Sequence, residues 1–348
     1  MISQARALIA LVALAALSVV CASAEAITFS PFVQQADLAA ALSNNATIGF
    51  AYAGNKFVGS VYFGTNNNQL YQTDLTGGNV QKFGAPIPTA SGEIYVSSSL
   101  GLGGFGSRDV FAGSEGVGIV YKFNNDGTGQ TPFVSGLSAG VRGIGFDPYG
   151  LYGNDMIVTT HDGTVYRVNS SGVATVLASV GEDTEGLSFA PQAFGPYPKG
   201  TLIVASEGSG SLRAIAPDGT ITFVASVGSA EMVSFVPLNL GTSGDPLEGF
   251  YAANFDINVV KAPASDFSAY IGDIVVTGET THLLTDVKWD GTQFLTSVIG
   301  SMPNQPEDGI FVTVDILNPG GGVPEPATVA LLGGALAGLA FARRRWLS

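Results

Sequence analysis

The sequence predicts an all-β fold, a six-bladed β-propeller with four-stranded antiparallel blades. The first observation is a short strand motif that returns at intervals of 45 to 50 residues, a period typical of propeller blades. Its copies begin at Leu70, Val120, Val165, Leu212, Val260 and Ile310. The second observation is composition, because 47 glycines and only 12% charged residues suit short strands and tight turns better than helices.

The other strands of each blade repeat in step with this motif. One strand ends in phenylalanine and, two residues later, proline, which cannot donate to a sheet ladder; its copies are 143–148, 186–191 and 232–237. The next strand is assigned to 155–159, 201–205 and 250–253, and the outermost to 132–134, 175–177 and 222–224. A β-sandwich or two small β domains remain as alternatives, in which the repeated spacing would be accidental.

The two ends of the repeat predict how the ring closes. The sixth copy supplies strands at 286–289, 293–298 and 310–314 and then runs into proline and glycine without a fourth strand. Residues 26–33 (AITFSPFV) resemble 220–225 (TITFVA) and have no blade of their own. We therefore expect 26–33 to be the outer strand of the last blade, which removes an exposed edge. The propeller then spans residues 25–317.

The segments between the strands are mostly short. Residues 34–42 (QQADLAAAL) predict a short helix or turn that links the closing strand to the first blade. Longer loops rich in glycine or proline are expected at 98–107, 192–199 and 238–248. Such loops are either binding segments or solvated spacers.

Residues 1–24 have the features of a secretory signal peptide, expected to be a helix recognised by the Sec export machinery. Arg6 precedes an apolar run at 7–20, and Ala22, Ser23 and Ala24 form a small-residue cleavage site before Glu25. Acylation at Cys21 is a second possibility, but Val20 stands where a lipoprotein signal has a small residue. Both interpretations predict export.

Charge and cysteine content exclude several classes of function. The whole chain has a net charge of −14, from 14 basic and 28 acidic residues. Four of the basic residues lie in the two terminal segments, which leaves 10 against 28 acidic residues, a net charge of about −18. Such a body repels nucleic acid, so no nucleic-acid partner is expected. The single cysteine lies in the leader, so the mature protein has neither a disulfide nor a thiolate metal site.

The C-terminal segment combines three features. A linker, 318–326, ends in Val323, Pro324, Glu325 and Pro326. The apolar run 327–342 predicts a transmembrane helix, although it is shorter than the roughly 20 residues of a typical span. Arg343, Arg344 and Arg345 begin a basic tail, 343–348, that would stay in the cytoplasm and leave the body outside. An ordinary membrane anchor is the alternative.

This arrangement resembles the PEP-CTERM sorting signal, which exosortase membrane proteases recognise in bacteria that make extracellular polysaccharide. The resemblance covers about the last 26 residues. It implies a transient anchor in the inner membrane that exosortase cuts at or near Pro324, Glu325 and Pro326. The body would then be released from the cell or displayed on its surface.

Charged residues recur where the innermost strands of the blades begin. Arg142, Glu185 and Glu231 occupy equivalent positions, and Glu93 and Asp286 are nearly equivalent. Because the inner strands surround the channel, these side chains should converge on one mouth. Carboxylates there could hold a hard cation such as Ca²⁺, or Arg142 could neutralise one of them. No P-loop, nucleophile elbow or His-Glu-x-x-His motif is present, so no catalytic residue is assigned.

The segments 185–189 and 286–291 resemble inner strands of gluconolactonase and regucalcin-like propellers and of NHL repeats. In the lactonase group a metal at the channel mouth polarises a lactone carbonyl. The sequence therefore leaves two hypotheses. The first is a non-enzymatic surface or matrix protein that binds a cation, a glycan such as extracellular polysaccharide, or another surface protein. The second is a metal-dependent lactonase-type hydrolase that uses Glu185, Glu231 and Asp286.

Overall fold

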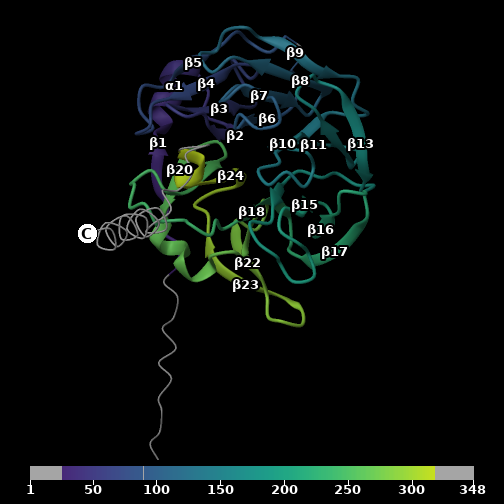
Figure 1. Ribbon diagram of the computed structural model, residues 1–348. Helices are drawn as coiled ribbons and strands as arrows, with labels where there is room; N and C mark the ends of the chain where they lie inside the picture. Colours follow the sequence, from purple (N-terminus) through teal and green to yellow (C-terminus); the bar gives the residue numbers. More distant parts are fainter. Residues whose placement is uncertain (1–25, 89, 318–348) are drawn as a thin grey trace, which may run out of the picture.

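The computed structural model is a ring of six four-stranded antiparallel sheets (Figure 1). It describes residues 26–88 and 90–317. This arrangement confirms the predicted six-bladed propeller. The predicted signal peptide (1–24), the linker and sorting motif (318–326), the apolar segment (327–342) and the basic tail (343–348) lie outside the described residues. Within the described ranges, no helix is long and apolar enough to cross a membrane.

Each of the first four blades is built from consecutive strands. The first contains β2 (Thr47–Tyr52), β3 (Phe57–Val61), β4 (Leu70–Thr73) and β5 (Gln81–Phe83). The second contains β6 (Ile94–Ser98), β7 (Val110–Ser114), β8 (Val117–Phe123) and β9 (Thr131–Ser135). The third contains β10 (Val141–Phe146), β11 (Met156–Thr160), β12 (Thr164–Val168) and β13 (Ala174–Ser179). The fourth contains β14 (Leu187–Phe189), β15 (Leu202–Ser206), β16 (Ser211–Ile215) and β17 (Ile221–Ser226).

The fifth and sixth blades are interlaced. From the axis outward, the fifth contains β18 (Ala230–Phe235), β21 (Ile274–Gly278), β22 (Leu283–Trp289) and β23 (Phe294–Ser301). The sixth contains β24 (Pro306–Val312), β19 (Gly249–Asn254), β20 (Asn258–Pro263) and β1 (Ser30–Val33). After β18 the chain therefore builds the middle of the sixth blade, returns to complete the fifth, and adds the innermost strand of the sixth last.

This interlacing corrects three strand assignments made from the sequence. The strand at 250–253 was expected to follow 232–237 within one blade, but β19 pairs with β20 and β24 instead. The strands at 286–289 and 293–298 were expected in the sixth blade, but they belong to β22 and β23, the third and fourth strands of the fifth. Consecutive strands of similar pattern do not reveal that a hairpin has been inserted into the neighbouring blade. The loop predicted at 238–248 is the crossover between the two blades.

The N-terminal strand closes the ring as the sequence predicts. β1 pairs antiparallel with β20, with Ser30 opposite Lys261 and Pro31 opposite Val260, and the purple N-terminal strand lies beside the green β20 in Figure 1. The predicted linking helix is α1 (Gln35–Leu42), which buries Leu38 and Leu42. Two more short helices are present in the described residues. The 3₁₀ helix η1 (Ala264–Tyr270) connects β20 to β21, and α2 (Val314–Leu317) follows β24. Residues 26–317 thus contain the whole closed ring.

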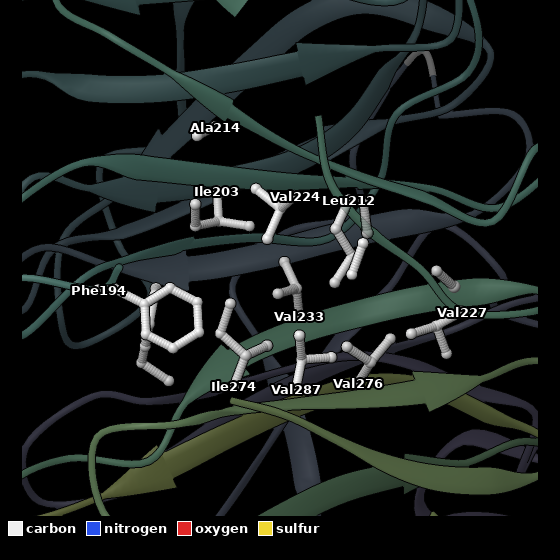
Figure 2. Close-up of a cluster of buried hydrophobic side chains, with 14 of the residues drawn as sticks. Phe194, Ile203, Leu212, Ala214, Val224, Val227, Val233, Ile274, Val276 and Val287 are labelled. Atoms are coloured by element: carbon white, nitrogen blue, oxygen red, sulfur yellow. The ribbon is translucent and has the colours of Figure 1, made fainter. Parts of the chain in front are cut away.

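The hydrophobic core lies between the faces of neighbouring blades. Figure 2 shows one such layer, in which Ile203 and Leu212 of the fourth blade face Val233, Ile274 and Val287 of the fifth. All five side chains are fully buried. Because each blade covers only one face of its neighbour, the layers become complete only when the ring is closed. The core therefore fixes the inner strands around the axis.

Candidate functional site at the channel mouth

The inner strands are irregular where they begin at one mouth of the channel. The register shifts at Arg142 between β10 and β11, at Glu231 between β18 and β21, and at Glu307 between β24 and β19. Such a bulge leaves one residue without a partner and redirects its side chain. The three bulges occur at the same place in their blades. They explain why charged side chains face the channel mouth rather than a neighbouring blade.

Close approach of the inner strands holds these residues near one another. The backbone N–H of Gly186 donates to the carbonyl of Glu231, 3.0 Å away, which joins the fourth and fifth blades. A Cβ at Gly186 would lie 2.7 Å from that carbonyl oxygen, and a Cβ at Gly143 would lie 2.3 Å from the carbonyl oxygen of Glu185. Glycine at both positions therefore lets adjacent blades meet at the mouth.

Arg142 is the cationic centre of the mouth. Its guanidinium lies 2.9 Å from a carboxylate oxygen of Glu93, 3.2 Å from Asp183 and 3.5 Å from Glu115, and it also pairs with Glu185. Burial lowers the pKa of Arg142, but the charges of Tyr95, Asp183 and Glu93 outweigh burial and raise that pKa above its ordinary value. One guanidinium of the third blade thus serves two carboxylates of the second blade and two carboxylates of the segment that leads into the fourth.

Glu185 also belongs to a second group of three carboxylates, two of which have no ion-pair partner among the described residues. Oxygens of Glu185, Glu207 and Glu231 all lie within 4.8 Å of one another. Glu185 is 1% exposed and Glu231 is 2% exposed. Oε2 of Glu185 and Oε1 of Glu231 are buried and accept no hydrogen bond from the described residues. Burial raises the pKa of Glu231 well above its ordinary value, and Glu93 and Glu279 add repulsion that Arg142 offsets only in part.

The acidic surface continues into the sixth blade. The side-chain amide of Gln305 donates to Glu279 and to Glu307, both at 2.7 Å. Burial and the charge of Glu231 raise the pKa of Glu307 to about 10. Burial and a hydrogen bond to Glu207 raise the pKa of Glu279 to about 7. Near neutral pH, Glu307 is therefore protonated and Glu279 is about half protonated unless a cation is added.

The structure brings together four of the five residues that the sequence placed at the mouth. Glu93, Arg142, Glu185 and Glu231 lie in one cluster. Asp286 does not, because it lies on β22, where it is opposite Val275 of β21 and Ser297 of β23. Burial and the charge of Asp273 raise its pKa to about 6. The correction follows from the interlaced blades, since β24 occupies the innermost position that 286–289 was expected to fill.

The sequence contains a signal for one mouth residue that the sequence analysis missed. Arg142, Glu185 and Glu231 each precede a phenylalanine by four residues, and Glu307 has the same spacing to Phe311. Applied to the last strand, this spacing would have identified Glu307 instead of Asp286. Glu207 and Glu279 follow the second strands of their blades and carry no comparable signal.

The arrangement suits the binding of a hard cation better than it suits acid–base chemistry carried out by one residue. Divalent calcium prefers several carboxylate oxygens, and its binding would remove the cost of burying adjacent negative charges. Glu207 and Glu231 are the best placed ligands, since Arg142 already pairs with one oxygen of Glu185. Within this group, Glu185 and Glu231 each have one buried oxygen without a hydrogen-bond partner among the described residues.

Comparison with protein families identifies one segment of the chain. Residues 322–345 match the PEP-CTERM protein-sorting motif, and this confirms the sorting signal predicted from the sequence. None of the curated proteins compared with the chain matches it.

Comparison with solved structures finds other propellers at low identity. A protein assigned as a gluconolactonase is 11% identical, with a TM-score of 0.51 over 81% of this chain and 84% of that chain. A streptogramin B lyase is 13% identical, with a TM-score of 0.48 over 81% of this chain and 76% of that chain. A chain from a nidogen/laminin complex is 12% identical, with a TM-score of 0.49 over 74% and 86%. At this identity the similarity shows the fold alone.

Proposed function

We propose that this chain is an exported, surface-sorted propeller whose acidic channel mouth binds a divalent cation such as Ca²⁺ and recognises an extracellular partner without catalysis. The sorting motif at 322–345 supports processing by exosortase and delivery to the cell envelope. An extracellular polysaccharide or another surface protein is the partner class that fits this location.

The observation that carries the proposal is the group of Glu185, Glu207 and Glu231, whose oxygens lie within 4.8 Å of one another. Isolated buried carboxylates at this spacing repel one another, and protonation or a bound cation must relieve the repulsion. A cation held by these residues would keep coordination positions open toward solvent. Hydroxyl or carboxylate oxygens of a glycan could complete its shell, which would join two acidic molecules that otherwise repel.

The hydrolase hypothesis needs a different set of residues from the one first assigned. Glu185 and Glu231 are close, but Asp286 belongs to another part of the fifth blade, and Arg142 pairs with Glu185. A lactonase-type reaction would have to use Glu207 in place of Asp286. The experiment below separates the two hypotheses.

The test is a titration of residues 26–317 with Ca²⁺. Calorimetry measures the heat of binding, and thermal unfolding measures the change in Tm. The double variant Glu207→Gln with Glu231→Gln should lose both the binding heat and the rise in Tm. Asp286→Asn is the matched control, because it also removes a buried carboxylate with a raised pKa, and it should bind Ca²⁺ like the wild type. Absence of binding in the wild type would refute the proposal. Ca²⁺-dependent hydrolysis of lactones that disappears in the double variant would instead support the enzyme.

A further inference from the structure

A second, separate feature lies at the other end of the channel. A cavity of about 720 Å³ runs along the inner strands from Tyr95, Arg142 and Glu185 to the loops at the opposite mouth. Its volume is within the range of small-molecule sites. Each inner strand contributes at least one apolar residue to its wall, including Ala51, Val96, Ile144, Leu187, Met232 and Ile310.

Arg108 is the unusual residue of this cavity. It lies in the loop between β6 and β7 and lines the cavity, yet it is only 8% exposed. Its guanidinium lies over the Tyr52 ring, 5.0 Å from the centroid. Its Nη2 atom is buried without a hydrogen-bond partner, and among the described residues no carboxylate lies within 4.0 Å of its nitrogens.

This lack of a partner stands out because the body is strongly acidic. Burying a cation without a counter-charge is costly, and here burial lowers the pKa of Arg108. The backbone also holds the residue in place. Arg108 has a left-handed φ of 61°, its N–H donates to Ser99, and its carbonyl accepts from the Asn125 amide. A strained backbone that fixes a buried arginine beside a cavity is typical of a functional position.

Three of the other charged groups of the cavity wall have ion-pair or hydrogen-bond partners. Arg142 and Glu185 pair with each other. Asp308 accepts hydrogen bonds from the backbone N–H groups of Phe50 and Gly309. Lys199 is exposed and, like Arg108, lies over an aromatic ring, 4.7 Å from the centroid of Tyr149, and Asp315 is the remaining charged group of the wall. Among the described residues, Arg108 is therefore the buried cation of the wall that has no carboxylate partner.

From this combination we infer that the channel binds a small amphiphilic anion, with its acid group on Arg108 and its apolar part against the inner-strand wall. A planar guanidinium binds a carboxylate through two parallel hydrogen bonds. The apolar wall would contribute affinity in proportion to the area covered. Exposed Leu102 and Leu238 at the rim extend the apolar surface to solvent. The acid group would lie at the mouth opposite the acidic cluster, and Arg142 and Glu185 line the far end of the same cavity.

The test compares two probes that differ mainly in charge. Octanoate and 1-octanol are each titrated into residues 26–317 by calorimetry. We expect octanoate to bind at least about tenfold more tightly, which corresponds to one charge-assisted hydrogen bond. Arg108→Met should reduce octanoate affinity to that of octanol and leave octanol binding unchanged. Arg108→Lys, which keeps the charge but not the planar fork, should be intermediate.

Lys82→Met is the control, since Lys82 is an exposed cation on the outer strand of the first blade. It should bind octanoate like the wild type. Equal affinity of the wild type for octanoate and octanol, or binding of neither, would overturn the inference. So would unchanged octanoate affinity in Arg108→Met. If that variant does not fold, the comparison of the two probes on the wild type still decides the outcome.

Discussion

Phe32 and Tyr251 lie edge to face, with their ring centroids 4.8 Å apart. Phe32 belongs to the N-terminal strand β1, and Tyr251 belongs to β19, which is made from the last third of the chain. Phe32 also meets Phe57 of the first blade at 5.1 Å. One aromatic side chain therefore joins the closing strand, the last blade and the first blade.

This contact predicts that Phe32→Ala destabilises the ring by about 2 kcal/mol, because a large, partly buried aromatic side chain is lost. Denaturant unfolding measures the change. Phe223→Ala is the control, since Phe223 also lies on an outer strand but is 63% exposed; it should change stability little. Equal effects of the two substitutions would show that β1 does not close the ring.

A buried tyrosine gives a second prediction. The hydroxyl of Tyr152, between β10 and β11, accepts a hydrogen bond from Leu202 N–H at 2.9 Å and donates to the Ile215 carbonyl, so it links the third blade to the fourth. Tyr152→Phe should destabilise the protein by about 1–3 kcal/mol, because it leaves buried backbone groups without a partner. Tyr149→Phe, at an exposed tyrosine three residues earlier, should have almost no effect on the unfolding midpoint.

Removal of the Arg142 guanidinium should strongly destabilise the folded protein. Arg142→Met would leave Glu93, Asp183 and Glu185 without their shared partner. We expect a loss of about 3–5 kcal/mol at neutral pH, as when one member of a buried pair is removed. Because protonation relieves the repulsion, the loss should shrink at pH 5. A loss of equal size at both values of pH would contradict an electrostatic origin.

The mouth also predicts how stability depends on pH when a chelator is present. Burial and the charge of Glu231 raise the pKa of Glu307 from 4.5 to about 10. The folded protein therefore holds this proton more tightly than the unfolded chain does. Stability is greatest below the ordinary value of 4.5 and falls as pH rises toward 10. Between pH 5 and pH 8 the loss from this group should be up to about 4 kcal/mol.

Denaturant unfolding in EDTA at pH 5 and pH 8 measures this difference. Glu307→Gln should reduce the difference between the free energies of unfolding at pH 5 and at pH 8. Added Ca²⁺ should raise stability at pH 8 much more than at pH 5, because the carboxylates must be ionised to bind it. Stability that increases from pH 5 to pH 8 in EDTA would show that the mouth carboxyls do not have raised pKa values.

Local patterns in the sequence were sufficient to predict the blade number, the closing strand and the linking helix. The alternation of residue types in segments such as 164–168 predicts a strand, and the period of 45 to 50 residues predicts the repeated blade. The pairing of β18 with β21 could not be predicted in the same way. Strands 249–254 and 274–278 both read as buried strands, and only contacts between blades decide which one pairs with β18.

The residues of the candidate site could likewise be predicted only in part. Glu185 and Glu231 were found because they open regular inner strands, and Asp286 was misplaced because its strand was assigned to the wrong position. The isolated guanidinium of Arg108 had no sequence signal. Its significance depends on the absence of a nearby carboxylate, which is a property of the folded chain.

The interlaced sixth blade also determines the order in which the protein can be completed during synthesis. Its four strands come from residues 30–33, 249–263 and 306–312, so it contains both the earliest and the latest strands of the ring. The first strand has no partner until β20 (Asn258–Pro263) has been synthesised, and the blade lacks its innermost strand until Val312. The final strand ends at Val312, close to the sorting motif that begins at residue 322. The last strand that the ring needs is therefore synthesised only shortly before the sorting motif, so that the propeller and the motif are completed almost together.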